Sequence, residues 1–142
     1  MVKKYDRHVL HENPKIEVVH IKWPPGAESR PHDHGKSYGK VKVLSGKVFQ
    51  LVFDKKTKKF LRRDVMVAGD VMIETPDLIH IMGNDSKTEI AETLHVYTPK
   101  LVMKYYSLAM FKWPGMPKLK KKRRRKSWPP KENLTKKWGP KL

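Results

Sequence analysis

The sequence contains no cysteine among its 142 residues, which excludes disulfide bonds, thiol catalysis and cysteine-ligated zinc sites. It also lacks any apolar run long enough to form a transmembrane helix. The first residues, Met1 to His8, lack the apolar stretch of a secretory signal peptide. We therefore expect a soluble, cytoplasmic protein with no membrane partner.

Acidic residues are scarce, because 14 Asp and Glu stand against 32 Lys and Arg, for a net charge of +18. The excess is uneven: residues 112–142 hold 13 basic residues and one acid, whereas residues 1–111 hold 19 basic and 13 acidic residues. The length suffices for one domain with a hydrophobic core. We predict a globular domain over residues 1–112 and a basic, disordered tail over residues 113–142.

The most basic part of the tail is Lys118 to Lys126, with eight Lys or Arg in nine residues. Such a block repels itself and favours disorder or a weak helix. One interpretation is a solvated segment that improves solubility. The other is weak, non-specific binding of nucleic acid or another polyanion, or nuclear import if the host is eukaryotic. Trp128 and Trp138 would then stack on bases, or else fold back onto the domain.

Short apolar and β-branched stretches separated by turn residues predict an all-β domain. Strands are expected at residues 16–23, 40–44, 47–53, 60–67, 71–75, 79–82, 91–98 and 101–111, with a further one around the two histidines near residue 33. No long segment repeats with a helical period. Many short strands at close intervals are typical of a small β-barrel or jelly roll.

His32 and His34 are two residues apart. Because alternate side chains of a β-strand share a face, both imidazoles would point one way and Asp33 the other. Two neutral imidazoles on one face can bind a first-row divalent metal. A pair of surface histidines is the alternative interpretation.

The expected strand at residues 91–98 has a polar face. Thr93, His95 and Tyr97 alternate along it, whereas Leu94 and Val96 lie on the other face. In a one-sided sheet the polar face would point to solvent, but in a small barrel it can line an internal site. In the second case the hydroxyl, imidazole and phenol lie close enough to form a hydrogen-bonded relay.

Two blocks of the sequence resemble the signature motifs of the cupin superfamily, whose members are small β-barrels. The matching residues are Gly26, His32, His34 and Gly46 in the first block and Gly69, His80 and Asn84 in the second. Gly39 occupies the position of the glutamate ligand of the first motif. The resemblance therefore implies a metal site of three histidines, His32, His34 and His80, without a carboxylate.

The missing glutamate points to a narrower resemblance. The segment from His32 to Gly46 is similar to the corresponding segment of bacterial-type members of the cysteine dioxygenase family. Three further segments agree with this family: Tyr5-Asp6-Arg7, the stretch from Thr93 to Tyr97, and Thr98-Pro99. The resemblance covers residues 5–100 in five separate segments.

This resemblance implies an enzyme that uses Fe(II) and O2 to oxidise L-cysteine to cysteine sulfinate. Arg7, with Tyr5, would hold the substrate carboxylate, because a guanidinium donates two parallel hydrogen bonds to such a group. Without the resemblance, Arg7 would be one more solvated basic residue.

The resemblance also assigns a role to the polar face. Tyr97 would present its phenol to the bound oxygen or sulfur, and His95 and Thr93 would orient it. In animal members a cysteine at the position of Gly39 is bonded to the tyrosine. Tyr97 should therefore remain an unmodified phenol in this chain.

Two alternative functions remain open. The first is a dioxygenase for another small thiol, such as 3-mercaptopropionate. The second is a non-enzymatic cupin that binds a metal or a small ligand and is localised by its basic tail. The polar face formed by Thr93, His95 and Tyr97 argues against the second, because a scaffold has no need of it. The sequence does not give the oligomeric state, and a monomer is expected.

Overall fold

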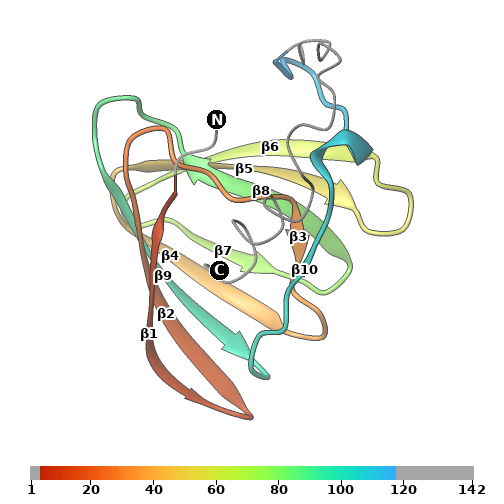
Figure 1. The fold of residues 1–142 in the computed structure, drawn as a ribbon. Coiled ribbons are helices and arrows are strands. Elements are labelled where there is room, and N and C mark those ends of the chain that lie inside the picture. The colour runs from red at the N-terminus through yellow and green to blue at the C-terminus, as the bar shows by residue number, and fades with distance from the viewer. Residues whose placement is uncertain (1–3, 118–142) are drawn as a thin grey trace, which may run out of the picture.

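A computed structural model describes residues 4–117, which form two antiparallel β-sheets packed face to face (Figure 1). The first sheet has the strand order β1-β2-β9-β4-β7, and the second has the order β10-β3-β8-β5-β6. The strands are β1 (Asp6–Asn13), β2 (Ile16–Trp23), β3 (His32–Asp33), β4 (Tyr38–Ser45), β5 (Lys47–Asp54), β6 (Phe60–Val67), β7 (Val71–Glu74), β8 (Leu78–Asn84), β9 (Ala91–Thr98) and β10 (Lys104–Tyr105). A short 3-10 helix, η1 (Leu108–Met110), follows β10.

The all-β prediction is confirmed. Strands β2, β6 and β9 have the predicted bounds, and β4, β5, β7 and β8 lie within two residues of them. As expected, β5 is buried on both faces in its central part. The tight turn at Gly46, between β4 and β5, needs glycine, because its φ is 79° and an added Cβ would lie 2.7 Å from the Cα of Ala91.

Two parts of the fold differ from the prediction. Strand β1 was not anticipated, because almost all of its side chains are exposed and its sequence shows no apolar alternation. The strand expected at residues 101–111 is wrong for most of its length, since only β10 pairs in a sheet. Tyr106 and Phe111 instead bury their rings against Phe53 and its neighbours on the second sheet.

The hydrophobic core has two parts. One lies between the sheets and includes Val19, Trp23, Val41 and Met82. The other covers the outer face of the second sheet, where Trp113 packs with its ring centroid 5.8 Å from that of Phe53. The chain therefore still packs on the domain at residue 113, and the predicted basic block at Lys118–Lys126 lies outside the described residues.

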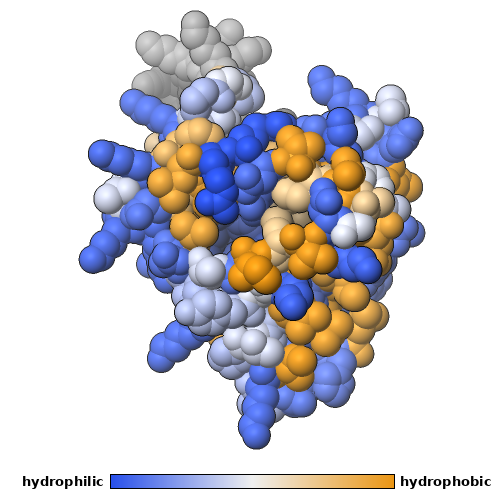
Figure 2. Space-filling view, turned by 180° about the vertical axis from the view of Figure 1, so that it is seen from behind, coloured by the Kyte–Doolittle hydropathy of each residue, from blue (hydrophilic) through white to orange (hydrophobic). Residues whose placement is uncertain are grey.

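The surface carries apolar side chains among many charged ones, and Figure 2 shows them gathered over part of one face. Exposed apolar residues are found on the edge strands, for example Val65 and Val67 on β6 and Val71 and Ile73 on β7. Within residues 4–117, no helix is long and apolar enough to cross a membrane.

Candidate active site

Three buried histidines meet between the two sheets. His32 lies on β3 and His80 on β8, and these strands pair at this one position. His34 follows directly after β3, and one ring nitrogen of each histidine lies within 4.8 Å of the others. Asp33 points elsewhere, as predicted, and accepts a 2.6 Å hydrogen bond from the Tyr106 hydroxyl. The structure thus brings the three predicted metal ligands together.

The protein fixes the tautomers of two of these histidines. Nδ1 of His32 lies 2.8 Å from the carbonyl oxygen of Arg30, which can only accept, so Nδ1 carries the proton. Nδ1 of His80 lies 2.9 Å from Oε1 of Gln50, whose amide group donates to Asp64. Both Nε2 atoms therefore offer lone pairs, and they lie 3.1 Å apart. Facing lone pairs at this distance fit a site for a metal cation.

Burial keeps the three imidazoles neutral, which is the form that binds metals. It lowers the pKa of His32 to about 4. It also lowers the pKa values of His34 and His80 well below their usual range, and the neighbouring histidines add to this effect. The site therefore presents neutral nitrogen donors near neutral pH.

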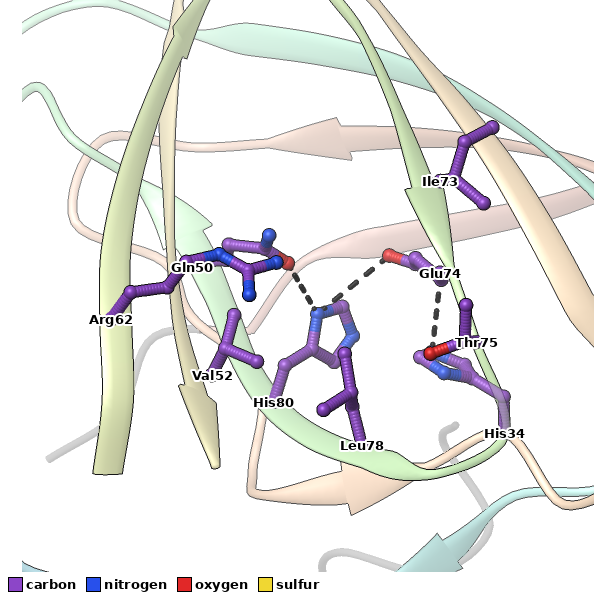
Figure 3. Close-up of a pocket in the computed structure, with 9 residues that line it drawn as sticks. All are labelled: His34, Gln50, Val52, Arg62, Ile73, Glu74, Thr75, Leu78 and His80. Carbon is purple, nitrogen blue, oxygen red and sulfur yellow. Dashed lines mark hydrogen bonds and ion pairs between the residues drawn. The ribbon is translucent and has the colours of Figure 1, made fainter. Parts of the chain in front are cut away.

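A carboxylate also lies at this site. Glu74, on β7, places Oε1 3.1 Å from Nε2 of His34 and Oε2 3.6 Å from Nδ1 of His80 (Figure 3). Burial raises the pKa of Glu74 to about 8. No hydrogen bond satisfies the Glu74 oxygens or the His34 ring nitrogens among the described residues.

No carboxylate ligand was predicted here, because Gly39 stands in the position of the motif glutamate, and the possible metal ligands that cluster among the described residues are the three histidines. Glu74 lies in the second motif block, six residues before His80, but its sequence context did not mark it as a site residue. The pairing of β4 with β7 brings Glu74 opposite Gly39. This pairing could not be predicted from the sequence.

Two site residues, Tyr97 and Glu74, lie close to Gly39. It pairs with Tyr97 across β4 and β9 and with Glu74 across β4 and β7. An added Cβ at Gly39 would lie 2.8 Å from Cε1 of Tyr97 and 3.1 Å from Oε1 of Glu74. Any larger residue here would have to move one of the two side chains.

The polar face of β9 points inward, as one of the two interpretations predicted. Thr93 Oγ1 lies 2.7 Å from His95 Nε2, and His95 Nδ1 lies 2.9 Å from the Tyr97 hydroxyl. The indole N–H of Trp23 donates a 2.9 Å hydrogen bond to Thr93 Oγ1. Trp23 was not predicted as a site residue, because its sequence context marked only the end of a strand.

The indole N–H of Trp23 determines the direction of the hydrogen bonds among Thr93, His95 and Tyr97. An indole N–H only donates, so the Thr93 oxygen accepts from Trp23 and its own O–H donates to Nε2 of His95. His95 then carries its proton on Nδ1 and donates to the phenol oxygen of Tyr97. Burial lowers the pKa of His95 to about 3, which keeps it neutral. The hydroxyl proton of Tyr97 is left to donate elsewhere.

Arg7 and Tyr5 line a pocket that also reaches His32, His80, His95 and Tyr97. Arg7 donates a 3.0 Å hydrogen bond to Glu17, and Glu17 also accepts the backbone N–H of Leu101. The ring of Tyr5 stacks on Trp23 with centroids 4.6 Å apart. The structure thus places both predicted substrate-binding residues beside the histidines, with an ion pair that the sequence did not reveal.

A second pocket lies on the other side of the histidines. His34, Gln50, Glu74 and His80 line it, together with Arg62 and apolar residues of β5, β7 and β8 (Figure 3). His80 lines both pockets, so its imidazole separates the Arg7 side from the Glu74 side.

A family model and curated relatives that match this chain give the same family. A family model described as cysteine dioxygenase type I matches residues 2–107. Human cysteine dioxygenase type 1 is 29% identical over 103 residues, which cover 68% of this chain and 52% of that protein. Zebrafish (Danio rerio) cysteine dioxygenase type 1 is 29% identical over 105 residues. The chain thus spans about half the length of the curated relatives it matches.

Solved structures share the fold. The cupin domain of Schizosaccharomyces pombe Cnp3 matches with a TM-score of 0.59 at 16% identity, over 70% of this chain and 64% of that one. A Klebsiella pneumoniae protein with a double-stranded β-helix domain matches with a TM-score of 0.59 at 22% identity, over 72% and 79% of the two chains. At these identities the likeness shows the fold alone, which is the predicted cupin-type β-barrel.

Proposed function

Because the chain belongs to the cysteine dioxygenase type I family, we propose that it is an iron-dependent thiol dioxygenase that converts L-cysteine and O2 to cysteine sulfinate. The observation that carries this proposal is the meeting of His32, His34 and His80 beside the inward polar row of β9. A structural histidine cluster would not need the hydroxyl, imidazole and phenol of that row to face the same space.

The three histidines would hold Fe(II). Their fixed tautomers and low pKa values support this role, because a metal ligand must be a neutral imidazole with a free lone pair. When bound, the iron would bring a thiolate and O2 together, and both oxygen atoms would end on sulfur without an external reductant.

Arg7 would hold the carboxylate of the substrate. It lines the pocket that reaches His32 and His80, and its ion pair with Glu17 fixes the guanidinium in place. A planar guanidinium has five N–H donors, so a bond to Glu17 leaves others for a ligand. Tyr5, stacked on Trp23, would form the adjacent wall of the substrate pocket.

Tyr97 would donate its hydroxyl proton to the reacting sulfur or oxygen. The direction of the hydrogen bonds from Trp23 through Thr93 and His95 supports this role, because His95 donates to the phenol oxygen and the O–H of Tyr97 remains a donor. Burial and the neighbouring Glu74 raise the pKa of Tyr97 well above its usual range, so the phenol stays protonated.

Oxygen uptake tests the proposal. The full-length chain, loaded with Fe(II), should consume O2 with L-cysteine, and mass spectrometry should show a product with two added oxygen atoms. His80→Ala should lose most of its iron and nearly all turnover, whereas His11→Ala, an exposed histidine, should lose neither.

Other thiols decide between the alternatives. If 3-mercaptopropionate were turned over faster than L-cysteine, the proposed reaction would stand and 3-mercaptopropionate would be the preferred substrate. If the chain bound iron but consumed no oxygen with L-cysteine, 3-mercaptopropionate or cysteamine, it would be a non-enzymatic cupin. Full iron occupancy and turnover in His80→Ala would contradict the assignment of the three-histidine centre.

A further inference from the structure

Asp33 is a buried carboxylate that lies between two of the proposed metal ligands but faces away from them. It is 2% exposed, and both of its oxygens have partners. The Tyr106 hydroxyl donates a 2.6 Å hydrogen bond to Oδ2, and the backbone N–H of Gly35 donates a 3.0 Å hydrogen bond to Oδ1. Nζ of Lys55 lies 3.5 Å from Oδ2. A buried charge with this set of partners holds the backbone that carries it in one conformation.

The bond from Gly35 to Asp33 closes a turn around His34. The other two histidines have their rings fixed through Nδ1, one by the carbonyl oxygen of Arg30 and one by Gln50. Among residues 4–117, neither ring nitrogen of His34 makes a hydrogen bond, although Oε1 of Glu74 lies 3.1 Å from its Nε2. The direction of the His34 ring therefore depends mainly on the turn that Asp33 closes.

The strand before this turn has little support of its own. Strand β3 has two residues and pairs with β8 at one position. On its other side it pairs with β10, and the N–H of Tyr106, directly after β10, donates to the carbonyl oxygen of Pro31. The Tyr106 ring packs at the outer face of the second sheet, with its centroid 6.2 Å from that of Phe111. Tyr106 thus ties the ligand strand to a hydrophobic cluster.

We propose that Asp33 is a positioning residue of the metal centre, and that the hydroxyl of Tyr106 holds it in place. Asp33 would fix the turn so that His34 and His32 address the same ion. This inference rests on the proposed function for the existence of the metal, but not on the identity of the thiol. Loss of the Asp33–Tyr106 bond would therefore weaken metal binding, although neither residue contacts the ion.

Cobalt(II) tests the proposal without relying on turnover, because its visible absorption reports ligand geometry. The full-length wild type, Tyr106→Phe and Asp33→Asn should each be titrated with Co(II) against a competing chelator. We expect each variant to bind about tenfold more weakly, as is typical when a group that orients a ligand is lost, and to shift the absorption bands of the saturated protein. The double variant should bind about as weakly as Asp33→Asn, because both changes remove the same hydrogen bond.

Val48→Ala is the control for a general loss of stability. Val48 is fully buried in the core between the sheets and lines neither pocket. This variant should be less stable toward urea, yet its affinity for Co(II) and its spectrum should not change, because the folded form dominates without denaturant.

Each other outcome counts against the proposal. Wild-type affinity and spectra in Tyr106→Phe and Asp33→Asn would overturn it, and so would an equal loss of affinity in Val48→Ala. Losses that simply add in the double variant would overturn the link between Tyr106 and Asp33. If Asp33→Asn does not fold, Tyr106→Phe decides alone, because it deletes one hydroxyl and keeps the ring. A wild-type chain that binds no Co(II) would contradict the proposed function and this inference together.

Discussion

Arg7 and Glu17 form a 3.0 Å ion pair, and their side chains are only 13% and 5% exposed. Arg7 is thus a substrate-binding candidate that already has an anionic partner in the fold. Removing either residue would leave the other charge buried and unpaired, which costs stability as well as binding. A test of the carboxylate clamp must separate these two effects.

We expect Arg7→Ala to lower kcat/KM for L-cysteine by at least about thirtyfold, since a charged partner in a desolvated site contributes roughly 2–5 kcal/mol. The same change should lower the free energy of unfolding by about 3–5 kcal/mol, because Glu17 loses its cation. Cysteamine, which lacks a carboxylate, should lose much less activity. Oxygen uptake and urea denaturation measure the two effects.

Glu17→Gln is the companion variant for Arg7. It removes the negative charge but keeps an oxygen that can accept the hydrogen bond from Arg7, so a true clamp should stay in place and bind L-cysteine at least as well as in the wild type. If Arg7→Ala reduced activity equally on L-cysteine and cysteamine, Arg7 would have a structural role only.

Tyr97→Phe removes one hydroxyl and keeps the ring. We expect a lower kcat, or more O2 consumed for each sulfinate formed, because the proton donor is lost. The N–H of His95 also loses its buried acceptor, so the free energy of unfolding should fall by about 1–3 kcal/mol. Unchanged rate and coupling would leave Tyr97 as a packing residue. The mass of the wild-type chain should show no crosslink, since Gly39 has no thiol.

His95 makes stability depend on pH. Its pKa falls from 6.5 in the unfolded chain to about 3 in the folded protein. The unfolded chain therefore binds the proton first as the pH drops, and the stabilising contribution is complete above 6.5 and lost progressively toward 3. From pH 7 to pH 5 this contribution should fall by about 2 kcal/mol.

A comparison of the metal-free wild type with metal-free His95→Asn isolates the contribution of His95 to the free energy of unfolding. Urea denaturation at pH 7 and pH 5 should show a smaller loss for His95→Asn than for the wild type, because the other buried histidines are common to both. Equal losses would mean that His95 does not stay neutral in the fold.

Truncation after Pro117 tests the basic tail, which includes Lys118–Lys126. Turnover should stay within about twofold, because the proposed site residues all lie between Tyr5 and Tyr97. Full-length protein should bind DNA weakly at low salt and release it near physiological salt, because counterion release makes such binding steeply salt-dependent. Filter binding with and without the tail measures this. Loss of folding or turnover on truncation would instead indicate that the tail packs on the domain.

Local patterns in the sequence predicted much of the site. His32 and His34 are two residues apart, and Thr93, His95 and Tyr97 alternate along one strand, so each set shares a face whatever the fold. His80 could be predicted only from the family motif, because it lies 46 positions after His34.

The missed parts depend on contacts between distant strands. Glu74 reaches the histidines only through the pairing of β7 with β4, and Gln50 supports His80 through the pairing of β5 with β8. Arg7 meets Glu17 because β1 pairs with β2, and β1 is an exposed edge strand without an apolar pattern. Residues 101–111 looked like a strand because they are apolar, yet they pack across a sheet instead of pairing in it.

The three histidines lie where the two sheets meet. His32 and His80 belong to strands of the second sheet, and His34 lies in the short connection from β3 to β4 of the first sheet. An ion held by all three would therefore tie the two layers together. The free energy of unfolding would then rise with the concentration of available metal. A chain made when iron is scarce would be less stable and more readily cut by proteases.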